Sequence, residues 1–453
     1  MLNYELNLKN FSLVKYNQYG DLILNNKHNN QHNKYYEPEV ISVLGIVVCL
    51  LGTLFYFYEY YLRVIPGVIR TDLKLAYNIT DASFGFLVGL YYWAYVPLQL
   101  VVGLFMDLLG PRIALTIACL ISALGIYLFA GTPYLLVAQI GRFLVGFGAA
   151  FAYVGVLKLA NMWLPKKLFA FVAGLCSTLG MLVGISGQIV IAKGVGLYGW
   201  QYTSYISGIV GIIFSLLLWL FIREPKNANQ IKSLENNKHR FHRQLKILSK
   251  ELKQVIKLKD LWLAGIIGCL TFAGLSVFAD VWSASFLKLA GIPKNLVGFS
   301  SAMIYIGFGI GAPIWGIFSD FINRRKLLLT LGSLIAAILI SIIIYFPMSL
   351  CWTNICLFLF GFFIGVEILV FAIINYLCHK EITATAMGFV NMLIMLGGFY
   401  LQPKIGIILD YLNKFEELVK FKIALTVLPA GLIIASVLSL FLTKDRVLGH
   451  TKN

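Results

Sequence analysis

Charged and metal-binding side chains are scarce in this chain of 453 residues. Asp, Glu, Lys and Arg make up 13% of it, whereas hydrophobic residues make up 59%. The six histidines lie in tails, loops or at a predicted helix end, so the sequence offers no metal cluster inside an apolar segment. None of the seven cysteines forms a Cys-x-x-Cys pair, and we expect them to be small packing residues. With a mean hydropathy of +0.82, the composition excludes a soluble protein and indicates a polytopic membrane protein.

Long apolar runs divide the chain into twelve candidate transmembrane helices. A bilayer core of about 30 Å takes roughly 20 helical residues. Helices are expected because an unpaired peptide group in hydrocarbon costs several kcal/mol. The sequence therefore predicts an all-α membrane protein. The predicted spans are 41–64, 83–105, 112–131, 134–158, 168–192, 201–222, 262–288, 297–319, 326–346, 351–377, 384–409 and 421–443.

The hydrophilic segments predict the orientation. The first forty residues are polar and lack the apolar core of a secretory signal, so we expect disordered tails at 1–40 and 444–453. Loops on the side of the two termini carry about twice as many Lys and Arg residues as the opposite loops. This pattern places both termini in the cytoplasm and explains the net charge of +17 without nucleic-acid binding. The Lys, Asn and Ile bias is typical of an AT-rich bacterial genome and favours a bacterial inner membrane, and the sequon at Asn78 matters only in a secretory pathway.

The longest interruption, 223–260, is a basic linker with eleven Lys and Arg residues against four acidic ones. It divides the spans six and six, into bundles at 41–222 and 261–443. Apolar residues recur within it at helical spacing with basic residues between them, which fits either a helix on the inner membrane face or a solvated linker. These apolar positions are Phe241, Leu245, Leu248, Leu252, Val255 and Ile256.

The two halves repeat a short motif at the predicted cytoplasmic ends of spans 2 and 8, GLFMDLLGPR and GIFSDFINRRK. Each copy places Gly four residues before Asp, followed by a turn and then Arg. Gly lets two helices approach closely, and Asp can hold a neighbouring helix through charged hydrogen bonds. The pattern predicts a gate built from Gly103, Asp107, Gly110, Arg112, Gly316, Asp320, Arg324 and Arg325.

This motif resembles the loop 2–3 motif GxLxDRxGRR of the major facilitator superfamily, from which it departs at Leu108 and Pro111. Span 4 is similar to the family's Arg-x-x-x-Gly-x-Gly motif through Arg142, Gly146 and Gly148. The resemblance covers about residues 41 to 443. It implies two six-helix bundles related by a pseudo-two-fold axis, transport by alternating access, and neither enzymatic activity nor a cofactor. Span 5 lacks the Gly-Pro pair of the family's drug antiporters, which counts against drug efflux.

Five charged residues fall inside the predicted spans: Glu59, Arg63, Arg142, Asp280 and Glu367. A charge at mid-bilayer costs about 2.5 to 3.5 kcal/mol, so each needs a partner, water or a function. Glu59 and Asp280 each lie eighteen residues after the start of their spans, which predicts matching depths on opposite sides of a central cavity. Glu59 also has Arg142 at similar depth and Arg63 one turn later as candidate partners, although Arg63 could instead reach the headgroups. Glu367 has no evident partner and is a candidate proton-binding residue.

Polar side chains in span 2 form a stripe, because Tyr91, Tyr95 and Gln99 share one helix face. This stripe, with Asn391 of span 11, fits either a solute site or helix packing. A second resemblance, to bacterial phagosomal amino-acid transporters and the related lysosomal dipeptide carriers, rests on these positions: Tyr58, Glu59, Tyr60, Arg63, Pro66, Tyr91, Tyr92 and Tyr95.

These features favour a monomeric secondary transporter of a zwitterionic solute, an amino acid or short peptide, coupled to protons through Glu59 or Glu367. The alternative within transport is a carrier of an organic or inorganic anion bound by Arg142 and Arg63. A sensor or membrane enzyme would need a soluble domain or a nucleophile with its base, and neither is visible in the sequence.

Overall fold

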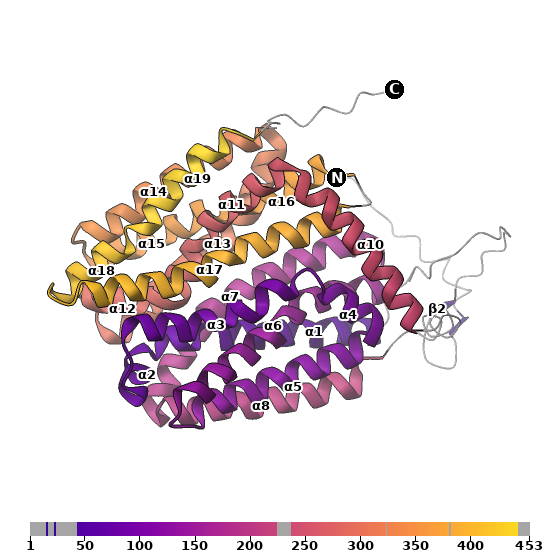
Figure 1. Cartoon of the computed structure of the whole chain (residues 1–453), viewed down its shortest axis with the longest axis horizontal. Helices are drawn as coiled ribbons and strands as arrows, with labels where there is room; N and C mark the ends of the chain where they lie inside the picture. Colours follow the sequence, from indigo (N-terminus) through magenta and orange to yellow (C-terminus); the bar gives the residue numbers. More distant parts are fainter. Residues whose placement is uncertain are drawn as a thin grey trace, which may run out of the picture.

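The structure is a computed structural model that describes residues 15–16, 22–23, 43–223, 237–322, 324–379 and 382–442. Figure 1 shows two helical bundles side by side, the first half of the chain in indigo to magenta and the second in orange to yellow. The predicted tails 1–40 and 444–453 lie outside the described residues, except for two short antiparallel strands, β1 (Lys15–Tyr16) and β2 (Leu22–Ile23).

The N-terminal bundle is built from long apolar helices joined by short turns. At Gly110 the chain adopts a φ of +77°, which glycine tolerates, and Pro111 then starts the next helix, where its missing N–H removes no hydrogen bond. The helices are α1 (Val43–Val68), α2 (Arg70–Tyr77), α3 (Asp81–Leu98), α4 (Val102–Leu109), α5 (Pro111–Ala130), α6 (Leu135–Trp163), α7 (Lys166–Tyr198) and α8 (Trp200–Phe221).

The C-terminal bundle repeats this plan. Its elements are α11 (Lys259–Ala273), η2 (Gly274–Trp282), α12 (Ser283–Leu289), α13 (Lys294–Ile322), α14 (Arg325–Tyr345), α15 (Leu350–Ile364), η3 (Gly365–Ile368), α16 (Leu369–Leu377), α17 (Thr383–Tyr411), α18 (Glu417–Leu425) and α19 (Val427–Ser439).

The predicted number of spans is confirmed, with one correction in span 2. Eleven helices in the described residues are long and apolar enough to cross a membrane, and the bent pair α3 and α4 makes a twelfth. Span 2 is not one straight helix, because α4 turns away from α3 by 66°. Pro97 lies just before the break, and the N–H groups of Gln99 and Val101 bond to carbonyls only three residues back. Proline removes a helical donor, and the tightened turn redirects the chain.

Spans 7 and 10 also depart from the regular α-helices that were predicted. Span 7 contains a π-helical segment, η2, that carries Asp280. Span 10 contains a 3-10 turn, η3, that carries Glu367. Such interruptions are uncommon inside helices and recur at functional sites. Both acidic residues predicted inside the C-terminal bundle therefore lie in irregular turns.

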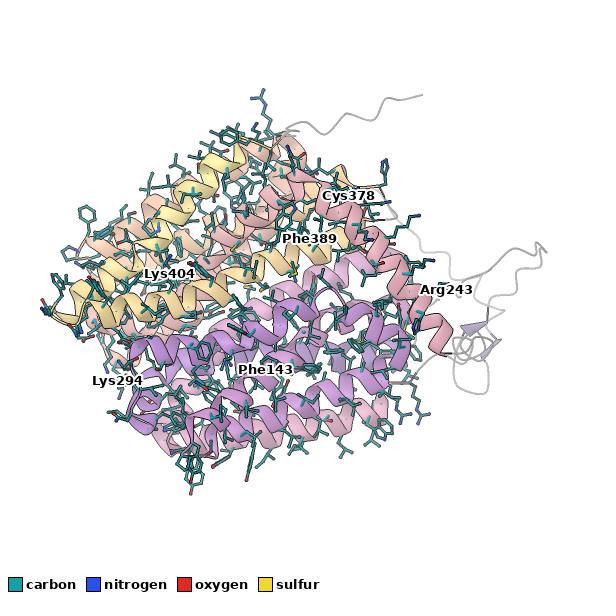
Figure 2. The ribbon with its side chains drawn as sticks, viewed as in Figure 1. Phe143, Arg243, Lys294, Cys378, Phe389 and Lys404 are labelled. Atoms are coloured by element: carbon teal, nitrogen blue, oxygen red, sulfur yellow. The ribbon has the colours of Figure 1, made fainter. Side chains whose placement is uncertain are left out.

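The linker helix α10 (Asn237–Lys257) defines one end of the molecule. Figure 1 places α10 at one end of the long axis and α2 and α18 at the other, and Figure 2 shows Arg243 and Lys294 at these opposite ends. We call them the α10 end and the α2 end. α10 packs against α4 of one bundle and α11 and α17 of the other, and Val255 is buried in that contact. The predicted linker thus forms a helix that bridges the bundles, while its segment 224–236 lies outside the described residues.

Candidate functional site

Arg63 forms a buried ion pair between the bundles. Its Nη2 lies 2.6 Å from Oδ2 of Asp280 in η2, and its Nε donates to the same oxygen at 2.7 Å. The hydroxyl of Tyr305 donates to the other oxygen of Asp280 at 2.6 Å. The rings of Tyr60 and Tyr92 lie 5.1 and 5.5 Å from the guanidinium carbon. With 6% of its surface exposed, Arg63 does not reach the headgroups, so that alternative is wrong.

The prediction that Asp280 faces Glu59 from a matching depth is also wrong. Asp280 lies beside Arg63 and Gly67 of α1, one to two turns beyond Glu59: a Cβ placed on Gly67 would come within 2.1 Å of the Asp280 carbonyl oxygen. The described helices begin at Val43 and Lys259, and not at 41 and 262, so Glu59 lies 16 residues and Asp280 21 residues beyond its helix start. At about 1.5 Å per residue, the five extra residues carry Asp280 about one turn further along.

Arg142 lies close to Arg63 and is 2% exposed. Its guanidinium group donates hydrogen bonds to backbone carbonyls and not to a carboxylate. Its Nη1 donates to the carbonyl of Leu62 at 3.0 Å and its Nη2 to that of Arg63 at 2.9 Å. Pro66 explains the first bond, because proline has no N–H and leaves the carbonyl four residues earlier without its helical donor. No described carboxylate forms an ion pair with Arg142, so the predicted Glu59–Arg142 contact is not a direct bond.

Glu59 is buried inside the N-terminal bundle and has no ion-pair partner among the described residues. It is 2% exposed, and within the described chain neither carboxyl oxygen accepts a hydrogen bond. The predicted i,i+4 pair with Arg63 does not form, because Arg63 is engaged by Asp280. The Ser122 hydroxyl lies beside the carboxyl group, and Arg142 acts on it through space. A buried carboxyl group without an ion-pair partner is suited to holding a proton.

The predicted polar stripe on α3 points to the same region. The rings of Tyr91 and Tyr95 stack 5.7 Å apart, and the guanidinium carbon of Arg142 lies 4.9 Å from the ring centre of Tyr91. One turn further on, Gln99 Oε1 accepts a hydrogen bond from Asn391 Nδ2 at 2.9 Å, across the interface between α3 and α17. The stripe therefore lines the seam between the bundles beside Arg142.

Glu367 lies apart from this cluster, inside the C-terminal bundle. It is buried, and it has no ion-pair partner in the part of the chain that the structure describes. Its turn η3 packs against α13 and α14. Gly365 permits this packing, because a Cβ there would lie 2.8 Å from the backbone nitrogen of Ala312. The described contacts do not join Glu367 to Glu59 or Arg142. Across the described residues, no group of three or more His, Cys, Asp or Glu residues could hold a metal ion.

The first gate motif makes contacts within its own bundle. Asp107 lies 2.5 Å from Nζ of Lys158 on α6. Arg112 donates to the carbonyl of Trp219 at 2.8 Å, with its guanidinium carbon 4.2 Å from that ring. Gly110 forms the turn between α4 and α5.

The second motif is similar. Asp320 pairs with Arg325 at 3.1 Å, Arg325 also donates to the carbonyl of Ala372 at 2.9 Å, and Arg324 is exposed. Among the described residues, the charges of neither motif contact the opposite bundle.

The glycines show which end of the molecule is closed. At Gly103 and Gly316, near the α10 end, a Cβ would meet no atom within 4 Å, so the predicted close approach of helices is absent there. At Gly67, Gly85 and Gly406, toward the α2 end, a Cβ would lie 2.1, 2.4 and 2.1 Å from a backbone oxygen of the opposite bundle. The bundles are therefore in close backbone contact at the α2 end, whereas the two motif glycines at the α10 end have no such neighbour.

Sequence reasoning missed two partners of these charges. Lys158 is the last residue of the predicted span 134–158 and lies at the same predicted cytoplasmic end as the first motif, which was a usable signal. Tyr305 is one tyrosine among 24, and nothing local distinguishes it. Its role follows only from its contact with Asp280.

Comparison with known proteins identifies the family. The model of the Major Facilitator Superfamily matches residues 48–401. This chain belongs to that superfamily. It is 24% identical to the D-galactonate transporter of Escherichia coli over 391 residues, which is 81% of this chain and 87% of that protein. It is 24% identical to the probable sulfoacetate transporter SauU of Cupriavidus necator over 291 residues, 62% of this chain and 65% of that protein. The match to the uncharacterized transporter YybO of Bacillus subtilis spans 45% of its length, so the chain spans less than two thirds of these last two relatives.

Solved structures share the fold. A bacterial homolog to the human lysosomal transporter Spinster, in an inward-facing and occupied conformation, has a TM-score of 0.70 at 15% identity over 88% of this chain and 97% of that one. A D-xylose-proton symporter has a TM-score of 0.70 at 14% identity over 89% and 98%. The predicted superfamily and fold are confirmed, and the relatives named here are transporters and not enzymes. The predicted amino-acid and dipeptide branch is not confirmed, because the sequence relatives include transporters named for sulfoacetate and D-galactonate.

Proposed function

We propose that this protein is a secondary transporter that moves a small organic anion together with a proton by alternating access of its two bundles. The observation that carries the proposal is Arg142, a buried cation with no carboxylate bonded to it in the described chain, near the buried carboxyl group of Glu59, which has no ion-pair partner there. The relatives named for sulfoacetate and D-galactonate, and the hexuronate transporter of Escherichia coli, support an anionic substrate.

Charge balance explains how a proton and an anion would travel together. Arg63 and Asp280 neutralise each other directly. With Glu59 ionised, its charge offsets that of Arg142, and the charges of these four side chains sum to zero. A proton on Glu59 leaves one unbalanced positive charge in a region of low dielectric, where charge interactions are strong. The site then favours one negative charge, and proton and anion bind as a neutral pair.

The stripe on α3 supplies the polar groups for such a solute. Tyr91 and Tyr95 offer hydroxyl groups beside Arg142, and Gln99 with Asn391 offers amides one turn away. Guanidinium recognises carboxylates and sulfonates, whereas hydroxyl and amide groups suit a polyhydroxylated carbon chain. We include Glu367 in the proposal as a second proton-binding candidate.

From the basic loops we infer that the α10 end and both termini face the cytoplasm, and we propose a bacterial inner membrane as the location. The close backbone contacts lie at the α2 end, whereas Gly103 and Gly316 at the α10 end have no close neighbour, so we infer an inward-facing conformation on this orientation. We propose a monomer as the working unit.

Uptake into proteoliposomes tests the proposal. Labelled D-galactonate, glucuronate and sulfoacetate would be compared with alanine and dialanine, with and without acid outside the vesicles. We expect accumulation of an acid only with the proton gradient and its loss in Arg142→Gln, while Arg223→Gln, at an exposed arginine outside the gate motifs, keeps wild-type uptake. Uptake of alanine or dialanine that the organic acids do not inhibit would contradict an anion carrier.

A zwitterionic solute is a second candidate, favoured by one observation: Glu59 lies close enough to Arg142 for a Coulomb interaction. An ionised Glu59 could hold an ammonium group while Arg142 holds a carboxylate. Glu59→Gln separates the two. An amino-acid carrier would lose binding, whereas a proton–anion symporter would still exchange its anion and would lose only the dependence on pH.

A further inference from the structure

The N-terminus of α3 is capped from the opposite bundle. A helix leaves the N–H groups of its first turn without helical partners. The N–H of Asp81 donates to Asp410 Oδ1 at 2.9 Å, and that of Ala82 donates to Asp410 Oδ2 at 2.7 Å. The next N–H, of Ser83, donates to the Thr80 hydroxyl at 3.3 Å. Thr80 belongs to the same bundle as α3, but Asp410 lies near the end of α17 in the other bundle.

The helix packing brings Asp410 to this position. Gly406 lies one turn before Asp410 on α17, and a Cβ there would lie 2.1 Å from the Asp81 carbonyl oxygen. One turn deeper, Gly85 of α3 meets the carbonyl of Gln402 in the same way, at 2.4 Å. Small residues thus let the two backbones touch, and the carboxylate reaches over the end of α3. Any motion that separates the bundles at the α2 end must break both of its hydrogen bonds.

Asp81, at the N-terminus of α3, has ion-pair partners of its own, and Asp410 caps the helix. The Asp81 carboxylate is ion-paired with Arg70 and with Lys74 of α2, the latter at 2.9 Å. The Arg70 guanidinium carbon in turn lies 5.1 Å from the ring of Phe421 in the opposite bundle. Asp81 therefore has its own partners within the bundle. The positive N-terminal end of α3 and the nearby cations favour a second carboxylate there.

We propose that Asp410 is a conformational latch: its carboxylate caps α3 across the bundle interface only while the α2 end is closed, and it thereby sets the balance between the two access states. The proposal rests on alternating access and is independent of which solute is carried. It assigns a role in gating to a residue outside the repeated motifs, whose aspartates pair within their own bundles.

Distances between spin labels at the α2 end test the latch. Tyr198 and Phe415 are exposed there on opposite bundles, and both would be replaced by labelled cysteines in a variant without the native cysteines. Without solute in nanodiscs, Asp410→Ala should raise the population with long label distances roughly 2- to 30-fold, the range that losing a helix-capping side chain produces. Asp410→Asn keeps one acceptor oxygen and should give an intermediate shift.

Two controls separate a latch from a merely structural cap. Thr80→Ala removes the cap that α3 receives from its own bundle, so it should lower thermal stability and leave the distance distribution unchanged. Glu417→Ala removes a carboxylate at the same end that pairs with Lys420 on its own helix, and it should also leave the distribution unchanged. A folded, monodisperse Asp410→Ala protein with the parent distribution, or an equal shift in Thr80→Ala, would overturn the latch. Failure of anion uptake would refute the proposed substrate without changing these distances.

Discussion

Replacing Asp280 should destabilise the protein more than replacing any exposed aspartate. Asp280 is 1% exposed, accepts two charged contacts from Arg63 and one hydrogen bond from Tyr305, and joins the two bundles. Asp280→Asn leaves the Arg63 charge buried without compensation, which costs about 3–5 kcal/mol. Tyr305→Phe removes one hydrogen bond to a charged group and should cost about 1.5–3 kcal/mol. For bundles of this size, roughly 2–4 °C of melting temperature corresponds to 1 kcal/mol.

Thermal unfolding of the detergent-solubilised protein measures these changes. The matched control is Asp320→Asn, since Asp320 also pairs with an arginine, Arg325, but its side chain is 73% exposed and the pair should be worth less than about 1 kcal/mol. Replacing both Arg63 and Asp280 by apolar residues of similar volume should recover most of the loss. A melting temperature for Asp280→Asn equal to that of the control, or a double variant no more stable than the single one, would refute the ion pair as described.

Three further predictions follow from the same contacts. Glu59→Gln should keep exchange of the solute between vesicle and medium while abolishing its stimulation by acid outside, and unchanged stimulation would exclude Glu59 as the proton-binding residue. Arg142→Lys cannot bond to both backbone carbonyls of α1; we expect the apparent affinity for solute to fall at least tenfold, measured by inhibition of uptake, and an unaltered affinity would assign Arg142 to helix packing alone. Gly406→Val clashes with the Asp81 carbonyl and should shift label distances at the α2 end toward the open state. In this conformation the Cβ of Gly103→Val meets no neighbouring atom, so that variant should not shift the distances. Equal shifts in both variants would contradict the assignment of the closed end.

Much of the fold could be predicted from local information. The number of spans follows from hydrophobic length, which a single helix must satisfy by itself. The break in span 2 had a visible signal in Pro97, but a proline permits a kink without requiring one. The π-helical and 3-10 turns around Asp280 and Glu367 had no such signal, because the packing of neighbouring helices decides where a helix is overwound or underwound.

The sequence predicted which residues belong to the candidate site, but not which of them pair with one another. Burial of a charge is costly wherever it occurs, so Glu59, Arg63, Arg142 and Asp280 could be selected from hydropathy alone. Their partners could not: Asp280 is 217 residues from Arg63, and the rotation and depth of one helix against another decide whether they meet. The proposed Asp410 latch shows the same limit, since the sequence does not tell whether an aspartate at a helix end is exposed to solvent or caps another helix.

By itself, the sequence determined that the chain crosses a membrane many times, that it forms two related halves, and that a few charges must be buried between apolar helices. These properties depend on composition and on the spacing of residues along the chain. Only the tertiary structure decided that Arg63 pairs with Asp280, that Arg142 serves the carbonyl freed by Pro66, and that the closed end is the one carrying α2. The reason is physical: a buried charge selects its partner by distance and orientation across helix interfaces, and those are properties of the packed bundles.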